Sequence, residues 1–285
     1  MREASETHDA AKLVLGVVSF NNSREQISQL MRSVEIAVAR LAGMPVSVEL
    51  NVIDNGAALP WPESDLKFHK FDSVGNIGFG KGMNLLMAAA FSDSATSWFL
   101  CVNPDGVLHY KVLSELLSSA DAFPDSLIEA RQFPEEHPKE YDPDTLDVSW
   151  ASGACLLIPR RIYETVGGFD PDFFMYMEDI DYSWRARAAG FSVKFAPKAL
   201  FGHDVLEREV KPEVEKYFLL SSRYLGLKWQ NPKFVKWVEK ELISRRLFAS
   251  RADLPSVPQP DMGKGKLDPA VADFKHQYYF APGRW

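Results

Sequence analysis

Short apolar runs alternate with amphipathic segments over the first part of the chain. Residues 12–20 (KLVLGVVSF) are apolar and β-branched and end in polar residues, which predicts a buried strand. A helix is expected from about residue 24 to residue 41, capped by Asn21 or Ser23 and closed by Gly43 and Pro45. Residues 46–56 (VSVELNVIDNG) predict a second strand that ends in a turn.

The same alternation continues to residue 106. Residues 67–71 (KFHKF) predict a short third strand, a glycine-rich loop at 75–82 leads into a helix at 83–91, and residues 96–106 (TSWFLCVNPDG) predict another buried strand. Strands that alternate with helices predict an α/β fold of parallel βαβ units. Because ligands bind beyond the carboxyl ends of such strands, the polar residues at 19–22, 54–55 and 103–105 are expected to meet at one crevice.

The pattern changes after residue 120. Residues 121–147 hold nine acidic residues against Arg131 and Lys139, with four prolines, which predicts a long irregular excursion with a solvated, acidic surface. Strand and helix patterns return between 150 and 197. From Pro212 the chain is expected to be helical, residues 228–251 carry seven basic residues against two acidic ones, and the tail from 252 is expected to be irregular.

Composition narrows the class of protein. The chain has 285 residues, 46% hydrophobic and 25% charged, which is typical of a globular protein with one large or two small domains. A net charge of −7 argues against a nucleic-acid partner. No apolar run approaches a membrane span of about 20 residues, and no signal peptide is expected, so the predicted location is the cytoplasm. Cys101 and Cys155 lie in apolar runs and are expected to be reduced core thiols.

Two loops carry candidate phosphate and metal chemistry. GNIGFGKG fits the P-loop pattern at Gly75, Gly80 and Lys81, but Gly82 stands where a P-loop requires Ser or Thr for Mg²⁺. The loop is therefore either an anion-binding loop at a helix start or a flexible turn. In NPDG at 103–106, Asp105 is either a ligand for a divalent cation or part of a proline turn.

Acidic and imidazole side chains supply the other candidates. Glu178, Asp179 and Asp181 open an expected helix, where they either complement its dipole or provide a general base. Glu178 has the further alternative of pairing with Arg185. His203 is either structural or the imidazole ligand of an oxygen-rich metal site. Ser152 lies in WASGA rather than G-x-S-x-G, which disfavours a serine hydrolase.

The order of these motifs resembles the family 2 glycosyltransferases, which have the GT-A fold. It runs VVSFNN, VIDNG, GNIGFGKGMN, NPD, SGACLLIPR, GGFDPDFFMYMEDIDYSWRARAAG and GH, and the stretch from 131 to 160 is most similar to the rhamnosyltransferase branch. The resemblance implies an irregular N-terminus at 1–12, a GT-A domain at 13–205 with a mostly parallel sheet flanked by helices, and a C-terminal helical appendage with an irregular tail at 206–285.

The resemblance also implies roles for individual residues. Asp179 takes the place of the catalytic base, and Asp105 and His203 take the places of ligands for Mg²⁺ or Mn²⁺. Asn103 departs from the family pattern, which has a carboxylate there. The donor nucleotide is expected at Phe20, Asn21, Asp54, Asn55, Asn76, Gly78, Lys81, Asn103 and Asp105, and the donor sugar and acceptor at Trp150, Ser152, Gly153 and Glu178.

The function implied is inverting transfer of a sugar, with L-rhamnose from dTDP-L-rhamnose as the best guess, to a glycan or lipid-linked glycan in bacterial surface polysaccharide synthesis. A UDP- or GDP-sugar donor is an alternative. A sugar nucleotidyltransferase is disfavoured because Ser19, Phe20, Asn21 and Asn22 replace the basic, glycine-rich loop it needs. A non-catalytic binding module is disfavoured by Asp179. Residues 228–251 are expected to pack on the domain, to lie on an anionic membrane or to form a homodimer face, which liposome flotation of charge-neutralised variants would separate.

Overall fold

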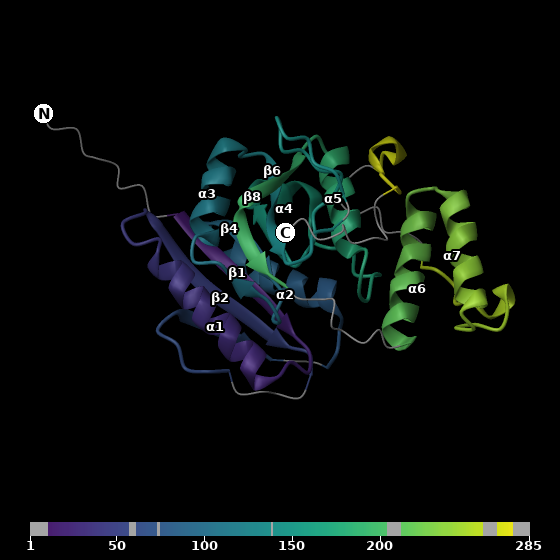
Figure 1. Ribbon diagram of the computed structural model, residues 1–285, viewed down its shortest axis with the longest axis horizontal. Helices are drawn as coiled ribbons and strands as arrows, with labels where there is room; N and C mark the ends of the chain where they lie inside the picture. Colours follow the sequence, from purple (N-terminus) through teal and green to yellow (C-terminus); the bar gives the residue numbers. More distant parts are fainter. Residues whose placement is uncertain are drawn as a thin grey trace, which may run out of the picture.

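An eight-stranded mixed sheet forms the centre of the protein in a computed structural model, which describes residues 11–56, 61–72, 75–137, 139–203, 212–258 and 267–275 (Figure 1). The strand order is β3-β2-β1-β4-β7-β6-β8-β5. The strands are β1 (Ala11–Ser19), β2 (Val46–Asp54), β3 (Lys67–Phe71), β4 (Thr96–Val102), β5 (Val107–Leu108), β6 (Ser126–Phe133), β7 (Cys155–Pro159) and β8 (Ser192–Gly202).

Most strands run in one direction, as the sequence predicts. Strands β3, β2, β1 and β4 pair in parallel, and so do β6 and β8. Only two of the described strands are reversed: β7 is antiparallel to β4 and β6, and β5 is antiparallel to β8. The predicted α/β class with a mostly parallel sheet is therefore confirmed, with β7 as an antiparallel insertion in its centre.

Helices cover both faces of the sheet and enclose two apolar cores. One core joins the sheet to α1 (Arg24–Ala39) and α3 (Val112–Ala122). The other joins it to α2 (Phe79–Ser92), α4 (Arg160–Val166) and α5 (Glu178–Ala188). Ser23 caps α1 in a reciprocal capping box with Gln26, which fixes where the chain turns from β1 into the helix. This frame holds the carboxyl ends of β1, β2 and β4 in place.

Two further helices, α6 (Pro212–Lys228) and α7 (Pro232–Ser244), pack against each other at the side of the domain (Figure 1). The buried face of α7 presents Val235, Val238 and Leu242, so its apolar side packs inward. Two single-turn helices follow, Arg251–Asp253 and Pro269–Val271. The predicted C-terminal helices are therefore present.

Several sequence predictions fall partly outside the described residues. Of the predicted irregular N-terminus at 1–12, residues 1–10 lie outside them, and Ala11 and Lys12 begin β1. The predicted boundary at 205 lies in the segment 204–211, which is also outside them. Within the described chain, no helix is long and apolar enough to cross a membrane. Cys101 and Cys155 are both free and buried, as predicted.

The acidic stretch at 121–147 corrects a sequence prediction. It is solvated only in part. Six of its acids are exposed, namely Asp121, Asp125, Glu140, Asp142, Asp144 and Asp147. The stretch also contains the end of α3 and the whole of β6, and Glu129, Glu135 and Glu136 are buried. The physical reason is that the two basic residues of the stretch accept the acids as partners: Arg131 pairs with Glu136, and Lys139 pairs with Glu129. Charge counting missed this because paired charges are buried far more readily than single ones.

Candidate active site

The ends of β1 and β2 meet the glycine-rich loop. The Asn55 backbone N–H donates to the Ser19 carbonyl at 2.8 Å, and its side-chain amide donates to the Gly78 carbonyl at 3.1 Å. The buried Asp54 carboxylate accepts from the Gly56 N–H at 2.9 Å. A Cβ on Gly56 would lie 2.7 Å from Asn21 Oδ1, so the polar ends of both strands are in contact. Phe20 stands half-exposed beside them.

The glycine-rich loop is itself fixed against the segment that leads into α5. Gly78 has φ +84°, and a Cβ there would lie 2.1 Å from the Phe174 carbonyl oxygen. Only glycine fits this left-handed backbone at such a close approach. The Asn76 side chain accepts from the Gly78 N–H at 3.2 Å, and Lys81 is exposed in the first turn of α2. The predicted third strand is correct, but α2 begins at Phe79, inside the expected loop.

Asp105 and His203 converge beyond β4 and β8. Asp105 Oδ1 lies 3.3 Å from His203 Nε2, and the Asn103 side-chain nitrogen lies 3.4 Å from the same atom. His203 Nδ1 lies 3.0 Å from Gln132 Oε1, to which it can donate, and in the neutral ring that hydrogen bond leaves Nε2 as an acceptor facing Asp105. Two acceptors at this distance repel each other unless a proton or a cation lies with them.

Asp179 is held at the start of α5 by two backbone amides. Its Oδ2 accepts from the Gly153 N–H at 2.9 Å, and its Oδ1 accepts from the Ile180 N–H at 2.8 Å. Tyr176 and Met177, which precede the helix, both have φ +69°, an unusual backbone that recurs at functional sites. Burial raises the pKa of Asp179, and the two amides and the charge of Lys139 oppose that rise.

The side chain of Glu178 lies against the first turn of α2, whereas that of Asp179 is held by the two amides. It is 5% exposed, and burial followed by the neighbouring charge of Asp179 raises the pKa of Glu178 well above its usual range. Its Cγ lies 3.6 Å from the position of a Cβ on Gly80, so it contacts the first turn of α2. The expected alternative of an ion pair with Arg185 is wrong, because Arg185 pairs with Asp181 at 2.7 Å.

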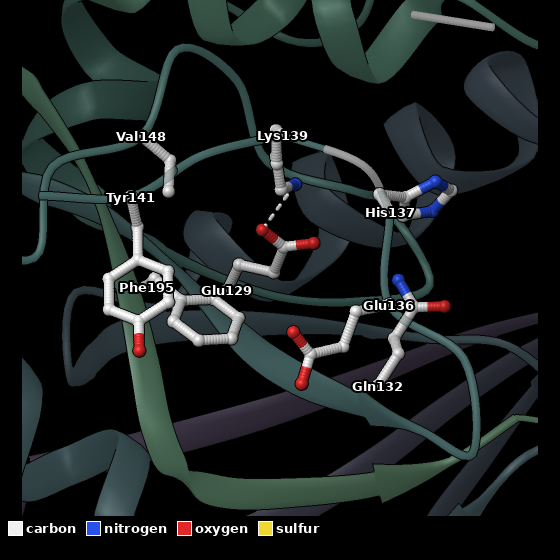
Figure 2. A pocket seen from close by; sticks show the side chains of 8 residues that line it. All are labelled: Glu129, Gln132, Glu136, His137, Lys139, Tyr141, Val148 and Phe195. Carbon is white, nitrogen blue, oxygen red and sulfur yellow. Dashed lines mark ion pairs between the residues drawn. The ribbon is translucent and has the colours of Figure 1, made fainter. Parts of the chain in front are cut away.

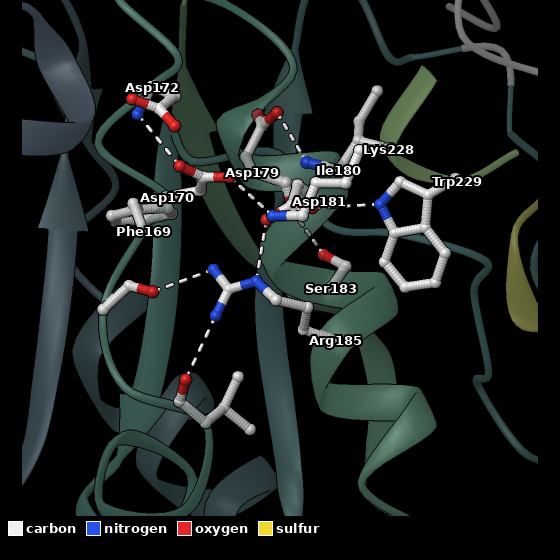
Figure 3. Close-up of polar contacts among 12 residues, drawn as sticks. Phe169, Asp170, Asp172, Asp179, Ile180, Asp181, Ser183, Arg185, Lys228 and Trp229 are labelled. Carbon is white, nitrogen blue, oxygen red and sulfur yellow. Dashed lines mark hydrogen bonds and ion pairs between the residues drawn. The ribbon is translucent and has the colours of Figure 1, made fainter. Parts of the chain in front are cut away.

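A buried polar network fixes α5 to α6 (Figure 3). Asp181 accepts from Arg185, from Trp229 Nε1 at 2.9 Å and from Lys228 at 2.9 Å. Lys228, which is fully buried, also pairs with Asp170 at 2.5 Å. Arg185 reaches the Val166 and Gly168 carbonyls. Most charges in the GGFDPD and EDIDYSWR motifs therefore position the helix that carries Asp179.

The structure brings the predicted residues together in adjoining groups. Trp150, Ser152 and Gly153 lie on the segment that reaches Asp179. The backbone of this segment is also connected to the loop that carries Asp105, because the Asn103 N–H donates to the Ala154 carbonyl at 2.8 Å. Within the described residues, no group of three or more His, Cys, Asp or Glu side chains is placed to hold a metal ion.

Sequence reasoning missed four polar residues behind this site. Gln132, which orients His203, is one of them, and Glu129, His137 and Lys139 line a small pocket with it (Figure 2). His137 packs edge-on against Trp150 at 5.0 Å between ring centres. In the sequence, the only sign of these residues was the basic Lys139 within the acidic, proline-rich stretch 121–147. A count of charges predicted that this stretch is solvated.

Comparison with known proteins agrees with this geometry. Residues 128–224 match the family model described as "Glycosyltransferase like family 2". The N-acetylglucosaminyl-diphospho-decaprenol L-rhamnosyltransferase of Mycobacterium tuberculosis H37Rv is 26% identical over 289 residues, covering 82% of this chain and 91% of that protein. Rhamnosyltransferase WbbL of Escherichia coli K12 is 37% identical over 60 residues, 21% of this chain and 23% of its own. The chain resembles the rhamnosyltransferase-like family 2 glycosyltransferases. The resemblance that the order of motifs predicts is thereby confirmed.

Solved structures show the fold of this glycosyltransferase-like chain. GalNAc-T7 with UDP, GalNAc and Mn²⁺ superposes with a TM-score of 0.62 at 13% identity, over 90% of this chain and 53% of that one, so this chain spans about half of its length. The mannosyltransferase PcManGT of Pyrobaculum calidifontis, with GDP-Man and Mn²⁺, gives 0.54 at 14% identity, over 81% of this chain and 75% of its own. The GT-A fold is therefore confirmed.

Proposed function

We propose that this glycosyltransferase transfers L-rhamnose from dTDP-L-rhamnose to a hydroxyl of a saccharide or lipid-linked saccharide in bacterial surface polysaccharide synthesis. The observation that carries the proposal is the carboxylate of Asp179, held by the Gly153 amide beside the joined strand ends. The sugar and the acceptor class follow from the rhamnosyltransferases that the chain resembles, one of which is named for a decaprenol-linked substrate.

The donor nucleotide is proposed to bind across the ends of β1 and β2. There, the Asp54 carboxylate would accept from the thymine N–H or from a ribose hydroxyl, with Asn55 fixed beside it by the Gly78 carbonyl. The half-exposed ring of Phe20 and the side chain of Asn21 would complete the base and ribose site. The diphosphate would then follow the loop that carries Asn76, Gly78 and Lys81, whose ammonium group is exposed at the helix start.

Asp105 and His203 have side-chain donor atoms of the kinds that bind a divalent cation. Asp105 and His203 present two acceptors 3.3 Å apart, and oxygen and imidazole donors suit Mn²⁺ or Mg²⁺. Asn103 adjoins them. These few protein ligands leave the rest of a coordination sphere to diphosphate oxygens and water. When bound, the cation would supply charge stabilisation for the departing nucleoside diphosphate.

Asp179 is proposed to remove the proton from the acceptor hydroxyl. As the proton moves to the carboxylate, the acceptor oxygen forms a bond to the anomeric carbon, and the bond from that carbon to the diphosphate oxygen breaks with its electron pair. This single displacement inverts the anomeric configuration. Trp150, Ser152, Gly153 and Glu178 line the acceptor and donor-sugar side. The base must be ionised, which the two amides and the charge of Lys139 favour against burial.

Nucleotide binding tests the donor class. Thermal shift with dTDP, UDP, GDP and ATP, each with and without Mn²⁺, is expected to show stabilisation by dTDP that increases with the metal, because a ligand of the folded state raises its stability. Stabilisation by UDP or GDP alone would show that the donor is a UDP- or GDP-sugar, and the proposed transferase reaction would stand. Stabilisation by ATP alone would contradict the proposed function.

Helix α7 has an exposed face that stays a predicted surface for contact with a membrane or a second copy of the chain. Its apolar residues Val235, Val238 and Leu242 pack inward, and Lys233, Lys236 and Lys240 are exposed on the other side. This apolar side packs against Leu219 of α6, and packing on the GT-A domain itself stays a prediction. We propose that these exposed lysines also contact the surface of an anionic membrane that carries a lipid-linked acceptor. Unchanged liposome flotation after their neutralisation would exclude that contact, and a homodimer would appear in sedimentation instead.

A further inference from the structure

A buried ion pair lies directly behind the segment that holds Asp179. Lys139 Nζ lies 2.5 Å from Glu129 Oε2, and the two side chains are 5% and 3% exposed (Figure 2). Removing two charges from water costs several kcal/mol per ion unless their other contacts are favourable. The proposed reaction does not use this pair, so its contacts with the site need a reason.

Both members of the pair contact residues 150–152. Glu129 Oε1 accepts from the Ser152 N–H at 3.1 Å, while Oε2 faces Lys139. The Lys139 ammonium lies 3.9 Å from the centre of the Trp150 ring, a cation–π contact. The following amide, Gly153 N–H, donates to Asp179 Oδ2. One backbone segment is thus held on one side by the ion pair and holds the carboxylate on the other.

We propose that Glu129 and Lys139 are positioning residues, which fix the segment 150–153 and so set the orientation and the charge of Asp179. The inference rests on the proposed role of Asp179 as the base. Glu129 acts through the Ser152 amide, and Lys139 acts through Trp150 and through its positive charge. Neither residue is assigned a contact with substrate.

The charges around the carboxylate determine the direction of the effect. Burial raises the pKa of Asp179, and the Lys139 ammonium opposes that rise. Burial likewise lowers the pKa of Lys139, against which Glu129, Asp179 and Glu136 act. Besides the pair and the carboxylate themselves, the titratable groups that interact with them are Cys101, Glu136, His137, Cys155 and Glu178. Removing the cation should therefore raise the pKa of Asp179, and removing the anion should lower it.

Two single variants and their combination separate charge from packing. Lys139→Met is expected to lower kcat about 10- to 100-fold, as misplacement of a catalytic group does, and to move the acid limb of the kcat–pH profile to higher pH. Glu129→Gln keeps an oxygen for the Ser152 amide and is expected to move the limb to lower pH. The double variant buries no unpaired charge, so its limb should return toward the wild-type position with partial recovery of kcat.

Matched controls make the outcome decisive. Lys194→Met breaks a second partly buried pair, with Asp147 at 2.9 Å, and should lower the melting temperature without moving the acid limb. An unmoved limb in both single variants would overturn the inference. If Lys139→Met does not fold, the limb of Glu129→Gln decides alone. Asp179→Asn is measured in parallel. Full activity of Asp179→Asn would reject Asp179 as the base. If Asp179→Asn is inactive and the variants of Glu129 and Lys139 behave like the wild type, only the positioning role is rejected.

Discussion

At the scale of single residues, the contact between Asp105 and His203 is the most informative feature of the proposed nucleotide site. Gln132 accepts from Nδ1, so the imidazole turns its other nitrogen toward the carboxylate. The cation proposed above would lie between these two groups, with Gln132 orienting the imidazole from behind. The Asn103 side-chain nitrogen lies 3.4 Å from His203 Nε2, so this amide would have to turn its oxygen toward the site for Nε2 to hold the proposed cation.

A substitution at Asp105 tests this interpretation. Asp105→Ala is expected to weaken binding of the nucleoside diphosphate about tenfold or more with Mn²⁺ present, because the cation loses a carboxylate ligand, and to change it little in EDTA. Titration calorimetry under both conditions measures the difference. Asp144→Ala, at an exposed turn, is the matched control. Equal affinities for wild type and Asp105→Ala with the metal would show that the carboxylate holds no cation.

The sequence predicted the polar ends of strands but not the residues that orient them. Asp54, Asp105 and Asp179 stand directly after strands or at a helix start, where chain geometry forces side chains toward one edge. Glu129 and Lys139 are ten residues apart, and much of the intervening chain is irregular, so no period connects them. Their burial depends on each other, and a count of charges along the chain does not contain that information.

At the scale of elements, α5 depends on the lysine at the end of α6. Lys228 is fully buried between Asp170 and Asp181, and Arg185 completes the pair on the other side of Asp181. Burial alone would raise the pKa of Asp181, but Arg185 and Lys228 outweigh it and lower that pKa. This contribution to stability is present above the unfolded-state pKa and is lost as the pH falls through the lowered folded-state pKa.

Breaking that contact should unfold the region rather than change the chemistry. Lys228→Met leaves two buried carboxylates without their shared cation and is expected to cost about 3–5 kcal/mol of unfolding free energy. Urea denaturation at neutral pH measures the loss. The exposed Lys236→Met is the control and should change stability by less than about 0.5 kcal/mol. A stability of Lys228→Met equal to that of the control would show that the network does not hold α5.

Element types were largely predictable, and their directions were not. The apolar period identified β1, β2 and β4, and the candidate caps Asn21 and Ser23 marked the start of α1, where the structure shows Ser23 as the cap. The reversal of β7 had no signal, because CLLIP is equally apolar whichever way it enters the sheet. The start of α2 at Phe79 was also missed, since glycines in its first turn indicate a loop unless the packing of Gly80 and Gly82 is known.

At the scale of the whole molecule, the net charge of −7 averages two opposite regions. Part of the acidic central stretch is folded into the sheet as β6, and Glu129 and Glu136 pair within the stretch, whereas the lysines of α7 are exposed. The GT-A domain carries the residues of the proposed nucleotide and sugar sites, and α6 supports α5 through Lys228. The C-terminal helices are thus part of the frame around the site as well as a candidate contact surface.

The central claim is that Asp179 is the base of the transfer, and Asp179→Asn tests it most directly. Asparagine keeps the size of the side chain and an oxygen for the Gly153 amide, but it removes the proton acceptor. Single-turnover transfer from dTDP-L-rhamnose, with donor affinity measured in parallel, is expected to slow about 10³-fold or more while the affinity changes less than roughly threefold. Transfer by Asp179→Asn at the wild-type rate would contradict the account.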